Sequence, residues 1–184
     1  FCATGRRGAG RGLEPWEMVA QLAAVRAAAP GHVAGAVFQG QGEPLATLDR
    51  VLAAADLLAD PCAGRIAARA ITLSTVGVVP GILRLARERR RERLIVSLTS
   101  AVDERRRALV PAAAAWPVAE LAEAVRTYQR AVGGRVTLGW VVLGGVNTGD
   151  DEVAALARHF HGVPIRLDLI DVNDPRPDGF RRAT

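Results

Sequence analysis

Lysine is absent from this sequence, and cysteine, methionine and aromatic residues are scarce. All 24 basic residues are arginines, and the 184 residues include two cysteines and one methionine. Cys2 and Cys62 are far apart, which excludes a disulfide framework and favours a reducing, intracellular compartment. No apolar run reaches the roughly 18 residues of a membrane span, and the first residues lack a signal-peptide pattern. We therefore expect a cytoplasmic protein with no membrane segment.

The size and charge of the chain set further bounds. Hydrophobic residues make up 49% of the sequence, enough for one sizeable core, so we expect a single domain over residues 1–184. The net charge of +5 and the pI of about 10.7 invite a polyanionic partner. Because the basic residues are all arginine, however, the charge is equally well explained by a composition bias. The sequence opens on Phe1-Cys2 without a methionine, and we expect it to begin inside a longer protein.

Segments with strand and helix patterns alternate along the chain. The strand-like segments are apolar and rich in β-branched residues, and the helical segments carry apolar stripes at helical spacing. Such alternation predicts parallel βαβ units. The expected strands are Val33–Gln39, Ala70–Ser74, Arg93–Leu98, Val136–Leu143 and Pro164–Ile170. The expected helices begin near Glu14, at Leu48 with Thr47 as the cap, and after Pro80, and span Asp103–Leu109, Val118–Val132 and Asp150–Phe160.

Polar residues follow the carboxyl ends of these strands, where parallel α/β barrels build their sites. They are Glu43, Ser74, Ser97, Asn147 and Asn173. The first site segment runs from Val33 to Leu45 as a strand, a Gly-x-Gly turn and a carboxylate before a proline. A dinucleotide-binding fold would require a glycine-rich turn that opens a helix directly. Here Glu43-Pro44-Leu45 follows the second glycine, so we favour the barrel.

Several motifs in fixed order carry a resemblance to a known family. Phe1-Cys2-Ala3-Thr4-Gly5 resembles the end of the Cys-x-x-x-Cys-x-x-Cys motif of radical S-adenosylmethionine (SAM) enzymes, in the form found in the RNA adenine C2-methyltransferases of the RlmN and Cfr family. The likeness is nearly collinear from Phe1 to Arg182. It continues through Glu17–Gln21, Phe38–Leu45, Thr72–Pro80, Ser97-Leu98, Asp103–Arg106, Leu143–Asn147, Leu169-Ile170 and Asn173.

The resemblance implies a partial (β/α)6-type radical SAM barrel, with five strands in this chain and the first strand missing. It implies two cofactors, a [4Fe–4S] cluster held by three cysteines and SAM bound to the open iron. Cys2 matches the third cluster ligand, and Gly42 and Glu43 match the pair that receives the SAM ammonium group. Ser74, Ser97, Leu98, Thr99 and Asn173 match further SAM contacts.

The function implied by the resemblance is methylation of C2 of adenosine through a 5′-deoxyadenosyl radical. The expected partners are 23S-type ribosomal RNA and an electron donor such as flavodoxin, with transfer RNA left open as a second substrate. We expect the protein to be a monomer. The other cluster cysteines would precede Phe1, and the methyl-carrying cysteine would follow Thr184, so no catalytic cysteine of this kind lies within the sequence. An N-terminal RNA-binding domain is expected outside it as well.

Several positions depart from the family pattern and leave two alternatives open. Glutamines replace both methionines of the Met-Gly-Met-Gly-Glu-Pro turn at Gln39 and Gln41, and Thr99-Ser100 replaces His-Ala. Gly139 replaces an acid, and Gly12 an asparagine. These changes put the substrate in doubt more than the cofactor. The first alternative is a divergent radical SAM enzyme acting on a peptide or small molecule, and the second is a non-catalytic RNA-binding or assembly protein that has lost the cluster.

Overall fold

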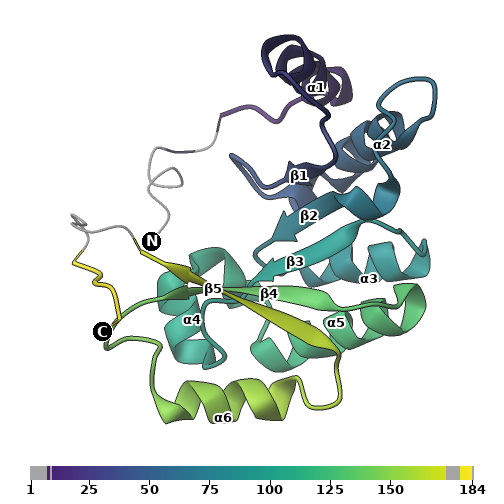
Figure 1. The fold of residues 1–184 in the computed structure, drawn as a ribbon. Coiled ribbons are helices and arrows are strands. Elements are labelled where there is room, and N and C mark those ends of the chain that lie inside the picture. The colour runs from purple at the N-terminus through teal and green to yellow at the C-terminus, as the bar shows by residue number, and fades with distance from the viewer. Residues whose placement is uncertain (1–7, 9, 173–178, 184) are drawn as a thin grey trace. The chain divides into compact units, whose positions relative to one another are not determined.

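The computed structural model describes residue 8, residues 10–172 and residues 179–183. They form two compact units, drawn in Figure 1. The N-terminal unit holds the chain up to Thr75 together with Arg91–Leu94. The C-terminal unit holds Val76–Arg90 and the chain from Ile95 onward. Each unit is described by itself below.

The N-terminal unit begins with helix α1 (Pro15–Ala28), which is fixed by its first turn. Glu14 is the N-cap, Pro15 occupies the first helical position, and Glu17 reaches back to the Glu14 backbone amide at 2.9 Å in a capping box. The chain then forms β1 (Ala36–Phe38), the 3₁₀ helix η2 (Pro44–Thr47), α2 (Leu48–Ala59), η3 (Ala68–Ala70) and β2 (Ile71–Thr75). Strands β1 and β2 are parallel, with Phe38 opposite Leu73.

The core of this unit lies between its helices and its strand pair. Its fully buried members come from α2, the loop after it and β2, and α1 adds half-buried side chains at its edge. Helices α1 and α2 contact each other and lie side by side in Figure 1. The buried residues of this cluster are Ala55, Leu58, Ile66 and Ile71, with Val19 and Leu22 packed against them.

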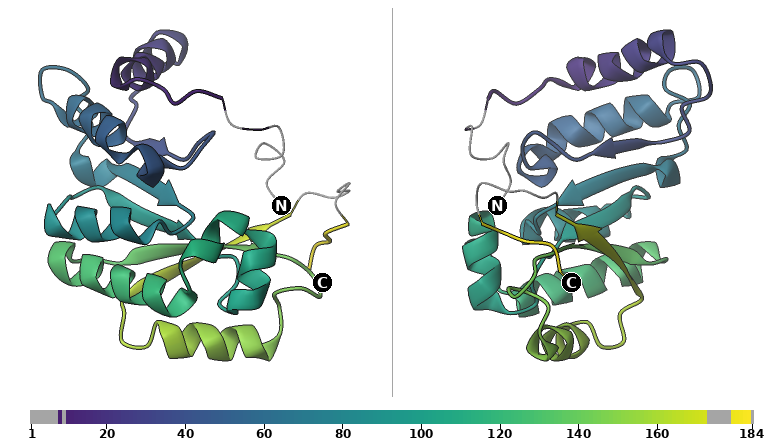
Figure 2. Two further views of the ribbon diagram at one scale, coloured as in Figure 1. Left: turned by 180° about the vertical axis from the view of Figure 1, so that it is seen from behind. Right: turned by 60° about the vertical axis from the view of Figure 1, so that its left-hand side comes forward.

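The C-terminal unit contains β4 (Val136–Val142), β5 (Ile165–Asp171) and the part of β3 (Arg93–Ser97) from Ile95 onward, three parallel strands joined by helices. Strand β4 lies between β3 and β5, with Ser97 opposite Gly139 and Gly139 opposite Asp168. The helices are α3 (Val79–Arg87), α4 (Asp103–Leu109), η4 (Pro111–Ala115), α5 (Val118–Val132) and α6 (Asp150–His159). Helices α3 and α5 pack against each other, as the left view of Figure 2 shows. Because the strands are parallel, their carboxyl ends share one edge.

The elements predicted from the sequence are present, with two corrections. The first strand is shorter than expected, because only Ala36–Phe38 pair with β2. Thr47 stands at the N-cap position of α2, but its side chain makes no capping hydrogen bond. Thr47 is the last residue of η2, and η2 leads directly into α2. The side-chain cap is instead made by Glu43, at the start of η2. Among the described helices, none has the length and apolar character needed to cross a membrane.

Candidate functional site

The turn after β1 exposes backbone where the sequence predicts close approach of a ligand. Gly40 and Gly42 have φ of +137° and +120°, in the region that only glycine adopts without strain. Among the residues that the structure describes, no atom lies within 4 Å of a Cβ built at Gly42, so they leave the space beside this backbone open. A small polar ligand could therefore approach the chain here.

Glu43 follows this turn and has a structural role that the sequence did not reveal. Its Oε1 accepts a hydrogen bond from the Leu45 amide at 2.9 Å, which caps η2. Pro44 and Leu45 are buried, while Glu43 itself is half-buried. The cap fixes the direction in which the carboxylate leaves the chain, and a carboxylate held in one direction is suited to accept from an ammonium group.

Ser74 lies at the same edge of the N-terminal unit as the glycine turn. Phe38 is opposite Leu73, and the chain continues from both strands toward their shared carboxyl end. Ser74 is half-buried, between the fully buried Leu73 and Thr75. The register therefore brings Gly42, Glu43 and Ser74 to one edge, as the strand-end rule predicts.

The exit from β3 holds three further predicted residues, Ser97, Leu98 and Thr99. Ser97 is half-buried, whereas Leu98 and Thr99 have exposed fractions of 0% and 1%. The amides of Leu98 and Thr99 both donate to the carbonyl of Gly139, at 2.9 and 3.2 Å. Leu98 packs into the core, so a contact from it to a ligand would use its backbone.

Thr99 combines two features that are costly in an ordinary loop. Its φ of +59° is an outlier for a β-branched residue, and its buried Oγ1 has no hydrogen-bond partner in the described part of the chain. Each feature typically costs on the order of 1–3 kcal/mol. Strained residues and unsatisfied polar atoms concentrate at functional sites, which supports Thr99 as a site residue.

Asn147 explains how this strained loop is held. Its Oδ1 accepts from the Leu143 amide at 2.8 Å, and its Nδ2 donates to the carbonyls of Thr99 at 2.6 Å and Val141 at 2.8 Å. The sequence placed Asn147 among the polar strand-end residues. In the structure it is buried and joins the β4 end to the β3 exit.

Glu152, which the sequence analysis missed, holds the same loop from α6. Its carboxylate is 2% exposed and accepts from Ser100 Oγ at 2.5 Å, the Ala101 amide at 2.7 Å and Arg105 at 2.8 Å. Arg105 also pairs with the exposed Asp151 at 2.6 Å, and its hydrogen bond lowers the pKa of Asp151. The pKa of Arg105 is raised first by its hydrogen bond to Glu152 and then by the one to Asp151. An acidic residue in a first helical turn gives no sequence signal of such a contact.

Arg106 is a second buried charge that the sequence did not single out. It is 1% exposed, and its guanidinium donates to the Val76 and Trp116 carbonyls. Its Nε has no hydrogen-bond partner within the residues described. Burial lowers the pKa of Arg106 to about 10. Its side chain lies beneath Gly77, close enough that a Cβ there would be 3.1 Å from the guanidinium. Arg106 thus supports the chain that follows β2.

Of the two predicted cofactors, SAM is the one that the described residues fit. The open backbone at Gly42, the oriented carboxylate of Glu43 and the half-buried hydroxyls of Ser74 and Ser97 are groups suited to the amino, carboxylate and ribose parts of SAM. Cys2 and Asn173 lie outside the described residues. Within residues 10–172 and 179–183, no group of three or more His, Cys, Asp or Glu side chains could hold a metal ion. Cys62 is exposed and free, and lies in the loop after α2.

Comparison with known proteins relates the whole chain to one family. No protein-family model matches the chain. It is 51% identical over 174 residues to a probable RNA methyltransferase of Anaeromyxobacter sp. strain Fw109-5, covering 95% of this chain and 52% of that protein. It is 39% identical over 176 residues to the dual-specificity RNA methyltransferase RlmN 1 of Myxococcus xanthus, covering 94% of this chain and 49% of that protein.

A solved structure extends the similarity to the fold. The crystal structure of a radical SAM methyltransferase from Sphaerobacter thermophilus matches 100% of this chain and 55% of its own, with a TM-score of 0.92 and 39% identity. This match confirms the predicted α/β radical SAM fold. The chain spans about half the length of each of these relatives.

Proposed function

Since this chain belongs to the RlmN/Cfr-like family of radical SAM methyltransferases, we propose that the protein containing it methylates C2 of adenosine in large-subunit ribosomal RNA. Transfer RNA is left open as a second substrate. The observation that carries the proposal is the match of the entire chain to a radical SAM methyltransferase structure at a TM-score of 0.92. We expect the protein to act in the cytoplasm as a monomer with a flavodoxin-like electron donor.

The proposal assigns the SAM contacts to residues that follow the strands. Glu43 would accept from the SAM ammonium group, and its cap on η2 would keep the carboxylate oriented before the ligand arrives. Gly42 would allow close approach because no side chain fills the space beside it. We assign the remaining contacts to Ser74, Ser97, Leu98, Thr99 and Asn173.

Cys2 would supply one of three thiolate ligands to a [4Fe–4S] cluster, with the other two in sequence before Phe1. When bound, the cluster and SAM would supply radical chemistry at a methyl group carried by a cysteine beyond Thr184. Within this chain, the task of the described residues is to bind and orient SAM. The buried side chains beneath the β3 exit would exclude water from that loop.

The test uses the full-length protein reconstituted anaerobically with iron and sulfide. We expect about four irons per chain in the wild type, and loss of the cluster in a Cys2→Ala variant. Cys62→Ala is the matched control, because Cys62 is exposed and belongs to none of the matched motifs. A cluster retained in Cys2→Ala would overturn the ligand assignment, and a wild type without a cluster would overturn the enzyme proposal and favour a binding module.

A second candidate is a radical SAM enzyme with a different substrate. It is favoured by residues that depart from the family pattern while the proposed SAM contacts remain. Gly139, where the family has an acid, leaves only ordinary contacts at 3.8 Å or more around its Cβ position. Reductive SAM cleavage without RNA methylation would support this candidate.

A further inference from the structure

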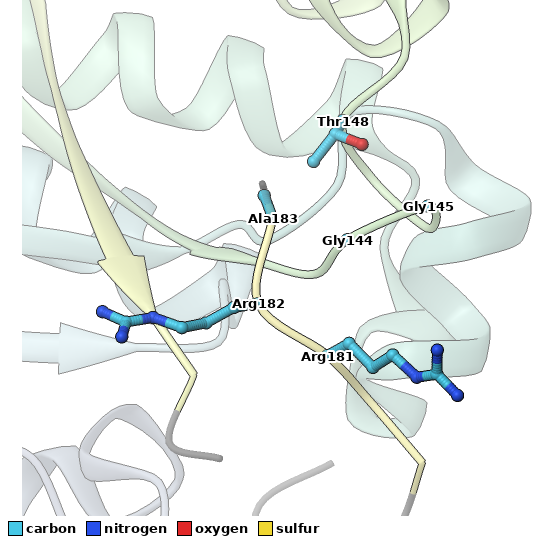
Figure 3. A pocket seen from close by; sticks show the side chains of 6 residues that line it. All are labelled: Gly144, Gly145, Thr148, Arg181, Arg182 and Ala183. Atoms are coloured by element: carbon cyan, nitrogen blue, oxygen red, sulfur yellow. The ribbon is translucent and has the colours of Figure 1, made fainter. Parts of the chain in front are cut away.

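A pocket of about 430 Å³ lies at the end of β4, outside the predicted SAM contacts. Its lining, shown in Figure 3, is Gly144, Gly145, Thr148, Arg181, Arg182 and Ala183. Strands β3 and β4 are parallel, so this pocket opens at the edge of the C-terminal unit where Ser97 ends its strand. The lining contains two arginines, a hydroxyl and two glycines but no carboxylate, which suits a small anionic group.

The chain around Arg181 is held firmly on the loop after β4. The Gly144 amide donates to the Arg181 carbonyl at 2.9 Å. A Cβ at Gly144 would lie 2.5 Å from the Arg182 carbonyl oxygen, so only glycine permits this approach. Phe180 packs against the buried cluster that includes Leu109 and Leu143. These contacts fix the backbone from which the Arg181 side chain extends.

The two arginines differ in their electrostatic partners. Arg182 pairs with Asp171 at the end of β5, at 2.7 Å. No carboxylate of the described residues pairs with Arg181, whose side chain is exposed. In Figure 3 the two guanidinium groups leave the backbone in opposite directions, with Arg182 directed toward β5. Asp171 therefore neutralises one charge, and the charge of Arg181 remains available for an external anion.

Gly145 and Thr148 complete the polar lining. Gly145 has φ of +72°, and a Cβ there would meet nothing within 4 Å, so its backbone is open to a ligand. Thr148 adds a hydroxyl that can donate to an oxygen anion. The lining of the pocket thus offers a guanidinium, a hydroxyl and open backbone, which are groups that recognise phosphate.

We propose that this pocket binds a backbone phosphate of the substrate RNA, with Arg181 as the charged contact and Thr148 as the neutral one. The proposal rests on the proposed function, because it assigns to that function a place where RNA would be held. The pocket lies at the strand-end edge, so a phosphate bound there would hold the RNA at the edge where the unit presents Ser97. Arg181 would act in RNA binding and would not contact SAM.

The experiment measures binding of the full-length protein to an unmodified large-subunit ribosomal RNA transcript over a series of salt concentrations. Arg181→Gln removes the charge, and Gly144→Ala displaces the segment that carries it. Arg130→Gln is the matched control, since Arg130 is exposed in the last turn of α5, at the opposite end of the strands. We expect Arg181→Gln to weaken RNA binding about 3–10-fold and to reduce the salt slope by about 1. Gly144→Ala should weaken it similarly, and Arg130→Gln should not.

SAM affinity, measured on the same proteins by calorimetry, separates this site from the cofactor site. We expect Arg181→Gln to bind SAM as the wild type does. RNA binding by Arg181→Gln that equals that of the wild type would overturn the phosphate site. A variant that loses affinity for SAM and not for RNA would overturn it as well. Either result would leave the proposed function intact. A wild-type protein that binds SAM but no RNA would overturn both.

Discussion

The carboxylate of Glu152 accepts a hydrogen bond from the backbone amide of Ala101 at 2.7 Å, across 51 residues of sequence. The same carboxylate accepts from Ser100 Oγ and from Arg105, and it is almost fully buried. Together with Asn147, which binds the Thr99 carbonyl, Glu152 holds the β3 exit in one conformation. This loop contains three of the proposed SAM contacts, so its rigidity bears on ligand binding as well as on folding.

Glu152→Ala should destabilise the protein strongly. The substitution leaves the Ala101 amide buried without its acceptor and removes the shorter of the two hydrogen bonds that the Ser100 hydroxyl makes, which typically costs about 2–3 kcal/mol in the free energy of unfolding. Urea denaturation of the full-length protein measures this loss. Asp151→Asn is the control, because it removes the exposed ion pair to Arg105, and solvent screens such a pair so that it adds little to stability. Equal effects of the two substitutions would show that the buried contacts add nothing.

Gly77→Ala should cost more stability than Gly133→Ala. Both glycines have positive φ, +103° and +79°, so alanine is strained at either position by about 1 kcal/mol. A Cβ at Gly77 would also lie 3.0 Å from two methyl groups of the buried Leu121, whereas nothing lies within 4 Å at Gly133. We expect a difference of about 1–2 kcal/mol between the variants in thermal unfolding. A larger effect at Gly133 would contradict this account.

Thr99→Val should separate stability from ligand binding. Valine keeps the shape of threonine but removes the buried hydroxyl that lacks a partner, so the free protein should be as stable as the wild type or about 1 kcal/mol more stable. If Oγ1 contacts SAM as proposed, affinity should fall about 5-fold through loss of one hydrogen bond. Thermal unfolding without SAM and calorimetric titration with SAM measure the two effects. Unchanged SAM affinity would remove the Thr99 side chain from the site.

The Arg11–Glu17 ion pair should make the N-terminal unit sensitive to acid. The hydrogen bond from Arg11 lowers the pKa of Glu17 from 4.5 to about 2, with help from the Glu14 amide. A lowered carboxyl pKa stabilises the folded state above pH 4.5, and this contribution is lost as the pH falls from 4.5 through about 2.

Carbon-detected NMR titration of the Glu17 carboxyl tests this directly. Arg11→Gln should move the midpoint toward the usual value, although the Glu14 amide still lowers it. Arg50→Gln, which removes only the ion pair to Glu14, should leave the midpoint in place. A wild-type midpoint near 4.5 would contradict the ion pair in solution.

The sequence predicted the elements of the fold well because their signals are local. Capping residues, β-branched strands and helical stripes marked α1, β2 and α5 within a few residues of their observed ends. The error at Thr47 arose because the sequence gives no sign that a 3₁₀ helix leads directly into α2. The boundary of β1 depended on its pairing with β2, which is a tertiary property.

The site was predictable only in part, for a related reason. The strand-end rule and the family resemblance name Gly42, Glu43, Ser74 and Ser97 as SAM contacts, and that role stays a prediction. Glu152 could not be found, since its partners lie about 50 residues away and only the fold brings them together. The left-handed backbone of Thr99 was equally hidden, because a β-branched residue is among the least expected there.

The central claim is tested most directly by mass spectrometry of ribosomal RNA. The full-length, reconstituted protein is incubated with reductant, isotope-labelled SAM and unmodified transcript, beside a Glu43→Gln variant. Glutamine can still accept from the Leu45 amide and keep the cap on η2, but it lacks the charge proposed to bind the SAM ammonium group. The account predicts labelled methyl at C2 of adenosine with the wild type and a loss of more than about 10-fold in the variant. Cleavage of SAM to 5′-deoxyadenosine with no methylated adenosine in the RNA would contradict it.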